Sequence, residues 1–155
     1  MPEGSAVKVA VLMGSTSDEE KMAPAKETLE KFGIEVDWRV MSAHRNPAKV
    51  AELAGNARAN GYVAMICGAG MAAHLAGVVA AHTTLPVVGV PLSGGALNGV
   101  DALYATVQMP KGVPVATVAV NGSMNAALLV VQMLGITDES MAAKLADHKR
   151  EMAGG

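Results

Sequence analysis

Short apolar runs alternate with longer amphipathic or alanine-rich segments along the whole chain. The apolar runs, rich in valine, predict five strands: Val7–Met13, Glu35–Val40, Tyr62–Cys67, Pro86–Val90 and Val115–Val120. The intervening and following segments predict helices near Asp18–Phe32, Pro47–Asn60, Ala72–Thr83, Val100–Val107, Met124–Leu134 and Asp138–Met152. Because the strands show little polar alternation, we expect helices to cover both faces of their sheet.

The strict alternation of strand and helix predicts an α/β fold built on a parallel sheet. Five strands favour a flavodoxin-like three-layer sandwich with strand order 2-1-3-4-5, followed by a C-terminal helix. We expect one domain over residues 1–155, because the chain has no linker, low-complexity tract or internal repeat. In such sheets ligands bind at the carboxyl ends of the strands, so candidate chemistry is sought in the loops that follow them.

The uncharged stretches of the chain are long for its size. Hydrophobic residues make up 51% of the sequence, and residues 59–100 and 112–137 contain no Asp, Glu, Lys or Arg. Glycine, proline, histidine and asparagine interrupt each stretch before about 18 continuous apolar residues accumulate, which argues against a membrane span. One subunit of 155 residues exposes too much surface to bury all of this, so we expect a homo-oligomer.

Net charge and cysteine content limit the binding partners and the cellular compartment that we expect for this protein. A net charge of −2 gives no electrostatic reason for binding nucleic acid or an anionic membrane surface. Cys67 is the single cysteine, so an internal disulfide is excluded and a reducing compartment is favoured. The segment Met1–Ser5 has neither the basic region nor the apolar run of a signal peptide. We therefore expect a cytoplasmic protein.

The loop after the second predicted strand carries the residues best suited to chemistry. Ser42-Ala43-His44-Arg45 lies between that strand and a helix that opens with Pro47, and proline suits the first helical position. Imidazole can give and take a proton near neutral pH, and guanidinium can bind a phosphate with two parallel hydrogen bonds. Taken alone, the same residues also fit a polar loop that caps a helix.

The loop after the first predicted strand suits an anion or a sugar. Ser15 and Ser17 bring hydroxyls to a helix N-terminus, where free backbone N–H groups favour anions. Asp18 would repel a phosphate, but its carboxylate can accept hydrogen bonds from both hydroxyls of a ribose. Ser17 with Glu20 also fits a capping box, a purely structural role.

Two further loops contain many small residues. Gly68-Ala69-Gly70 follows the third predicted strand and lets a ligand approach the backbone closely. His74 is expected in the first turn of the next helix, where a role in the site and one at a subunit contact both fit. The spacing is not that of a dinucleotide-binding fingerprint. The loop Pro91–Gly99 fits either a mobile flap or a plain connection.

Together these motifs resemble the N5-carboxyaminoimidazole ribonucleotide mutase (PurE) family of purine biosynthesis. The shared residues lie between about residues 7 and 135: Met13-Gly14-Ser15, Ser17-Asp18, Ser42-Ala43-His44-Arg45, Gly68-Ala69-Gly70, Ala72-Ala73-His74-Leu75, Gly89-Val90-Pro91, Ala96-Leu97, Gly99 with Asp101, Val107-Gln108-Met109-Pro110 and Asn125-Ala126-Ala127-Leu128-Leu129. Met71 and Ala76 depart from the glycine and proline that the family often has.

The resemblance implies a flavodoxin-like octamer that uses no metal, ATP or organic cofactor. The substrate of the family is a ribonucleotide monophosphate bearing an aminoimidazole, and the reaction of the family moves a carboxylate from the exocyclic nitrogen to ring carbon C4. His44 would be the catalytic acid and base. The substrate-binding residues would be Ser15, Ser17, Asp18, Ser42, Ala43, Arg45, Gly70, Ala73, His74 and Leu75.

Alternative functions remain open at this point. The run from Gly68 to Leu75 looks like the mutase branch of the family, and the rival is a carboxylase that joins aminoimidazole ribonucleotide to CO2 directly. A non-enzymatic nucleotide-binding domain would share the architecture. A phosphoacceptor receiver is disfavoured because Met13 and Cys67 stand where its acidic residues belong. A flavin site is disfavoured because aromatic residues make up only 3% of the chain.

Overall fold

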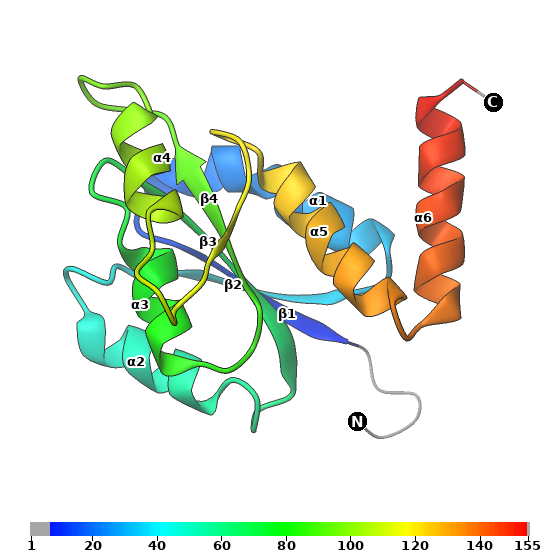
Figure 1. Cartoon of the computed structure of the whole chain (residues 1–155), viewed down its shortest axis with the longest axis horizontal. Coiled ribbons are helices and arrows are strands. Elements are labelled where there is room, and N and C mark those ends of the chain that lie inside the picture. Colours follow the sequence, from blue (N-terminus) through cyan, green and yellow to red (C-terminus); the bar gives the residue numbers. More distant parts are fainter. Residues whose placement is uncertain (1–6, 155) are drawn as a thin grey trace.

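The computed structural model describes residues 7–154 as a twisted sheet with helices on both faces (Figure 1). Its strands are β1 Lys8–Met13, β2 Glu35–Val40, β3 Tyr62–Gly70, β4 Val87–Leu92 and β5 Ala116–Thr117. A 3-10 turn η1, Thr16–Asp18, precedes six helices: α1 Glu19–Lys31, α2 Pro47–Asn56, α3 Leu75–His82, α4 Val100–Val107, α5 Ser123–Gly135 and α6 Glu139–Met152. The segment Met1–Ser5, which bears on the signal-peptide prediction, lies outside the described residues.

The five strands are parallel and ordered β2-β1-β3-β4-β5, so the predicted α/β fold and strand order are confirmed. Met13 at the end of β1 stands opposite Val40 of β2 and Gly68 of β3. Gly70 of β3 stands opposite Leu92 of β4. Because these carboxyl ends lie in register, the loops that follow them meet at one edge of the sheet.

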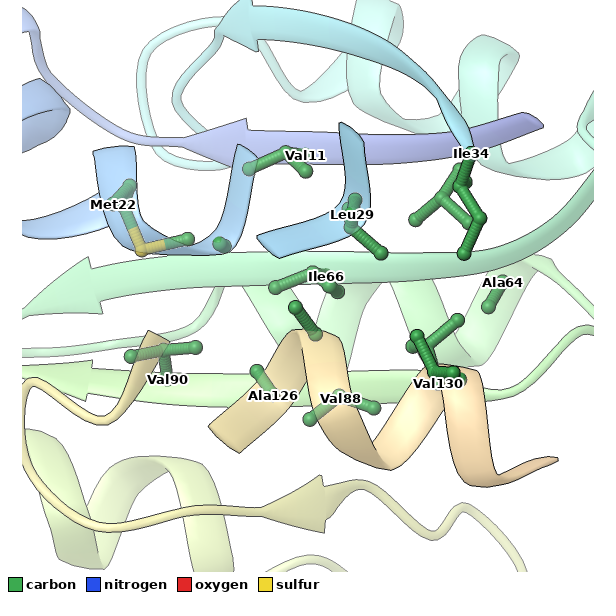
Figure 2. Packing of buried hydrophobic residues seen from close by; sticks show 14 of the residues in the cluster. Val11, Met22, Leu29, Ile34, Ala64, Ile66, Val88, Val90, Ala126 and Val130 are labelled. Atoms are coloured by element: carbon green, nitrogen blue, oxygen red, sulfur yellow. The ribbon is translucent and has the colours of Figure 1, made fainter. Parts of the chain in front are cut away.

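Side chains of alternate strand residues enter two separate cores. Helices α1 and α5 cover one face, where Val11, Ile66 and Val130 belong to a fully buried cluster (Figure 2). Helices α2 and α3 cover the other face, against residues such as Leu12 and Met65. Burying one such aliphatic side chain is worth about 1.5–3 kcal/mol, so the two cores fix the sheet firmly between the layers.

Strand β3 is longer than the sequence predicts. It continues to Gly70 instead of ending at Cys67, because Pro91 and Leu92 of β4 run alongside and pair with it. The glycine-rich segment is therefore the end of a strand and not a loop. Its backbone is held by sheet hydrogen bonds on the side of β4, which makes it a rigid wall.

The helix α3 and the strand β5 also differ from the prediction. Helix α3 begins at Leu75, so His74 is the residue that precedes the helix and does not lie within its first turn. Strand β5 is reduced to Ala116–Thr117, where the sequence predicts Val115–Val120. The chain leaves the sheet after Val118, whose N–H still donates to the Gly89 carbonyl, and then turns through Asn121 at φ 61°.

Helix α6 stands beside α5, away from the sheet (Figure 1). Met141 on its first turns is buried in the core of the α1 and α5 face. Asp138 caps the helix by accepting from the N–H groups of Ser140 and Met141, at 3.0 and 3.2 Å. None of the helices within residues 7–154 combines the length and the apolar character that crossing a membrane requires.

Gly89 of β4 lies close against residues of helices α3 and α4. A Cβ added there would overlap Cγ2 of Thr106 and stand 3.2 Å from Cβ of Ala76. We expect Gly89→Ala to lower the free energy of unfolding by about 1–3 kcal/mol through overpacking. Gly55→Ala is the matched control, because its Cβ would meet no atom closer than 3.9 Å and alanine favours the α2 helix. Urea denaturation of both variants tests this, and equal midpoints would contradict it.

Candidate functional site

The loops after β1 and β2, together with the end of β3 and the loop after it, line a half-open cavity of about 360 Å³ at the carboxyl edge of the sheet. The residues that line it are Gly14, Ser15, Ser17, Asp18, Ser42, Ala43, His44, Arg45, Ala69, Gly70, Met71, Ala72, His74 and Leu75. All the candidate site residues predicted from the sequence are among them except Ala73. The register of the strands thus brings together residues that lie far apart in the chain.

The loop after β1 turns back on itself before helix α1 begins. Ser15 Oγ accepts from the N–H of Ser17 at 3.3 Å and lies 3.0 Å from Ser17 Oγ. This contact caps the η1 turn, while Asp18 precedes α1 without making a capping hydrogen bond. The Ser17–Glu20 capping box that the sequence suggests is therefore wrong, because η1 moves the helix start to Glu19. Ser15, Ser17 and Asp18 all face the cavity instead.

The Asp18 carboxyl is partly buried at the wall of the cavity. Loss of contact with water raises its pKa above the ordinary value, since burial disfavours the charged form. The charge of Lys21 and the backbone of Ser15 oppose this rise. Asp18 forms no ion pair with a lysine or arginine within 4.0 Å in the part of the chain that the structure describes. Its oxygens are placed to accept hydrogen bonds from a bound ligand.

The loop after β2 is a tight turn that leads directly into helix α2. Ser42 Oγ accepts from the N–H of Arg45 at 3.1 Å, and the Ser42 carbonyl accepts from the N–H of Asn46 at 2.8 Å. Asn46 then caps α2 by accepting from the N–H of Lys49 at 3.4 Å. These bonds fix the turn and leave the His44 and Arg45 side chains exposed toward the cavity.

The imidazoles of His44 and His74 form a hydrogen bond across the cavity. Nε2 of His44 lies 2.6 Å from Nδ1 of His74, and the ring planes cross at 82°. One of the two nitrogens donates and the other accepts, so a single proton lies between the rings. The bond joins residues 30 positions apart and fixes the orientation of the His44 ring.

The end of β3 supplies the remaining wall of the cavity. Met71 is 59% exposed and adopts a left-handed backbone with φ 49°. Ala73 is 2% exposed and does not line the cavity, unlike its neighbours Ala72 and His74. Gly14, Ala69, Met71 and Ala72 also line the cavity, although they are not among the candidate site residues named one by one from the sequence. Ala69 lies within β3, and the other three follow the ends of β1 and β3.

Two other side chains that could take part in chemistry, Cys67 and His148, do not line the cavity. Cys67 is fully buried in β3, and burial raises the pKa of its thiol. His148 is buried on α6 and packs edge-on against Phe32, with ring centroids 6.1 Å apart. Within residues 7–154, no three His, Cys, Asp or Glu side chains are grouped so that they could hold a metal ion.

Comparison with known proteins places this arrangement in a family. The family model described as AIR carboxylase matches residues 8–154. The N5-carboxyaminoimidazole ribonucleotide mutase of Saccharolobus solfataricus is 50% identical over 145 residues, which cover 94% of this chain and 92% of the relative. The chain therefore belongs to the AIR carboxylase family, and the resemblance seen in its motifs is confirmed.

Two other relatives show how widely the domain is used. The phosphoribosylaminoimidazole carboxylase of Saccharomyces cerevisiae is 50% identical over 137 residues, which cover 88% of this chain but 24% of the longer yeast protein. The crystal structure of Treponema denticola PurE superposes with a TM-score of 0.86 at 28% identity, over 95% of this chain and 92% of that one. The fold is thus shared well beyond close sequence relatives.

The environment of Asp18 predicts a cost to stability at neutral pH. A carboxyl whose folded pKa lies above its unfolded value destabilises the fold once pH exceeds the folded value, and this penalty vanishes below the unfolded value. We expect Asp18→Asn to raise the thermal midpoint at pH 7, with the gain shrinking as pH falls toward 3.8, the ordinary pKa. Thermal melts of both proteins across this pH range measure the effect.

Asp138 is the matched control, because its pKa is shifted in the opposite direction. The backbone N–H of Met141, together with Ser140, holds the pKa of this carboxyl below its usual value. Asp138→Asn should therefore lower the midpoint slightly at pH 7, since asparagine still caps the helix but carries no charge. A lower midpoint for Asp18→Asn at pH 7 would contradict the assigned penalty.

Proposed function

We propose that this protein is an isomerase of purine biosynthesis that converts N5-carboxyaminoimidazole ribonucleotide to 4-carboxy-5-aminoimidazole ribonucleotide. The observation that carries the proposal is the hydrogen-bonded pair His44–His74, 2.6 Å apart, in one cavity with Asp18 and Arg45. A group that exchanges protons, a cation for phosphate and an acceptor for sugar hydroxyls are the three groups this reaction needs. The mutases that resemble the chain over 94% of its length support the same reaction.

In this proposal different cavity residues bind different parts of the ribonucleotide. Arg45 binds the phosphate through charge-assisted hydrogen bonds, together with the Ser17 hydroxyl and the backbone N–H groups at the start of α1. Asp18 accepts from the ribose hydroxyls, and Ser15 contacts the ring end of the substrate. This division keeps the Asp18 carboxylate on the sugar, where it does not repel the phosphate.

His44 supplies and then recovers one proton. In its protonated form it gives the proton to the exocyclic nitrogen as the N–C bond of the carbamate breaks, which releases CO2 and leaves a neutral amine. Ring carbon C4, enriched in electrons by that amine, attacks the CO2 and forms the new C–C bond. Neutral His44 then takes the C4 proton, so the residue ends as it began. His74 orients the ring through its hydrogen bond.

The wall formed by β3 retains the CO2. Gly70, which has no side chain, and Ala72, which has only a methyl group, lie there, and the adjoining backbone is held in the sheet. A released molecule of CO2 has little with which to form hydrogen bonds, so geometry and the exclusion of water must keep it beside C4. No metal, ATP or organic cofactor enters this scheme.

We also infer that the protein works in the cytoplasm as a homo-oligomer, and the family resemblance favours an octamer. Leu97, Val100, Tyr104 and Val107 are 45–62% exposed and recur at helical spacing on and before α4. An apolar stripe of this kind is typical of surfaces that meet another subunit. The long uncharged stretches of the sequence support the same inference.

A carboxylase is the second candidate. The family model is described as AIR carboxylase, and the yeast relative is named phosphoribosylaminoimidazole carboxylase. Such an enzyme would join CO2 to aminoimidazole ribonucleotide in the same cavity, with His44 needed only to remove the C4 proton. The two candidates therefore share the second half of the chemistry and differ in the first substrate.

Replacing His44 tests the proposed reaction directly. Purified protein is mixed with N5-carboxyaminoimidazole ribonucleotide without ATP or added bicarbonate, and the C4-carboxylated product is followed by ultraviolet absorbance. We expect rapid conversion by the wild type and a loss of about 10²–10⁴-fold in His44→Asn, with nucleotide binding retained, because only proton transfer is removed.

Two results would overturn this proposal. Turnover of His44→Asn within a few-fold of the wild type would exclude His44 as the acid and base. Product from aminoimidazole ribonucleotide plus CO2, with none from the carbamate, would assign the protein to the carboxylases.

Replacing Arg45 tests the phosphate site. Arg45→Ala should weaken binding of aminoimidazole ribonucleotide by about 10–100-fold, the usual worth of a charge-assisted hydrogen bond. Arg39→Ala is the matched control, because Arg39 pairs with Asp37 at 3.0 Å on β2 and does not line this cavity. Calorimetric titration compares them, and equal affinities would remove Arg45 from the phosphate site.

A further inference from the structure

Lys21 joins helix α1 to a loop that lies 72 residues away in the chain. Its Nζ donates to the carbonyl of Ser93 at 2.5 Å in a partly buried position. The backbone of Lys21 is fixed as well, because its carbonyl accepts from Oγ of Ser123 at 2.7 Å. A lysine side chain that is held at both ends loses much of its freedom, which makes the contact well defined.

The side chain of Asn121 forms two further hydrogen bonds with Ser93. The N–H of Ser93 donates to Oδ1 of Asn121 at 2.9 Å, and Nδ2 of Asn121 donates to Oγ of Ser93 at 2.8 Å. Asn121 adopts a left-handed backbone with φ 61°, a conformation that asparagine tolerates better than most residues. The carbonyl, the N–H and the hydroxyl of Ser93 are thus all bonded, two of them by Asn121 and one by Lys21.

Ser93 is the first residue of the loop 93–99, which leads from β4 to α4 (Figure 1). The loop starts at the rim of the cavity, because Leu92 pairs with Gly70, and Gly70 lines the cavity. Its next turn meets the rim again: the sulfur of Met71 lies 3.1 Å from the position of a Cβ on Gly95. Residues 95–98 are otherwise exposed, so these contacts set where the loop stands.

Lys21 also acts on the cavity through its charge. It is the lysine whose positive charge opposes the rise in the pKa of the Asp18 carboxyl. Asp18 and Lys21 lie one turn apart at the start of α1. The charge of Lys21 therefore acts on Asp18, although the Lys21 side chain does not line the cavity. One side chain therefore touches the loop and stabilises the carboxylate that faces the ligand.

We propose that Lys21 is a positioning residue for the ribonucleotide: it fastens the base of loop 93–99 at the cavity rim and places a positive charge one helical turn from Asp18. The proposal rests on the nucleotide-binding part of the proposed function and on no step of the chemistry. Asn121 serves the first role only, because it bonds Ser93 and carries no charge. This difference separates the two roles by experiment.

The test uses four single variants of the full chain. Lys21→Met removes the charge and the hydrogen bond, and Lys21→Arg keeps both. Asn121→Gly removes the side-chain bonds to Ser93 and allows the left-handed backbone. Lys26→Met is the matched control, because it removes a lysine from the exposed side of the same helix, near Trp38. Hydrogen exchange of residues 93–99 reports the loop, and calorimetric titration with aminoimidazole ribonucleotide reports binding.

We expect Lys21→Met to speed exchange in the loop and to weaken binding about tenfold, the usual scale for a hydrogen bond to a charged group. Lys21→Arg should restore both to within about threefold, and Lys26→Met should change neither. Asn121→Gly should speed exchange as Lys21→Met does but weaken binding less, because Asp18 keeps its neighbouring charge.

Unchanged exchange and affinity in Lys21→Met would overturn the proposal, and so would a loss that Lys21→Arg fails to rescue. If Lys21→Met does not fold, Lys21→Ala replaces it, and unchanged loop exchange and affinity in that variant would overturn the proposal. None of these measurements requires turnover. A protein that binds the ribonucleotide but does not isomerise it would contradict the proposed reaction while leaving the role of Lys21 supported by its own data.

Discussion

The site depends on one constraint, the common register of the parallel strands β1 to β4. Met13 stands opposite Val40 and Gly68, and Gly70 stands opposite Leu92, so four chain segments turn away from the sheet at one edge. A hydrogen bond of 2.6 Å between His44 and His74 requires that the loops after β2 and β3 be placed to within a fraction of an ångström. Two buried cores, one on each face, supply the rigidity that such placement needs.

Small residues beneath the site allow the layers to approach closely enough for this geometry. A Cβ on Gly68 would overlap the thioether of Met22, and one on Gly89 would overlap Thr106. Glycine in a strand weakens its conformational preference, so these positions cost stability locally. In return the helices pack close against the sheet, and β3, which pairs with β4 as far as Gly70, forms a firm backbone wall for the cavity.

Much of the fold and part of the site could be predicted from the sequence, for physical reasons. Unalternating valine-rich strands between helices determine a parallel sheet, and such a sheet places its functional loops at one edge. The pairing of His44 with His74 and the extension of β3 depend on a neighbouring segment, so local sequence carries no sign of them. Lys21 was missed for the same reason, because its partner Ser93 is 72 residues away. Ala73 lies within a motif of lining residues, yet it is buried and does not line the cavity.

The charged residues around the cavity are not arranged for the greatest stability of the empty protein. Arg45 faces the cavity without an acidic partner within 4.0 Å among residues 7–154, and Asp18 is withdrawn from water without a direct cation. Pairing these two residues with each other would stabilise the empty protein and occupy both groups that the proposed function assigns to the nucleotide. Lys21 resolves part of this conflict: by bonding Ser93 it stays out of the cavity, yet its charge still reaches Asp18. Under the proposed function the ligand supplies the missing partners, an anion for Arg45 and two hydroxyls for Asp18. The interactions that the empty site lacks would then contribute to the free energy of binding.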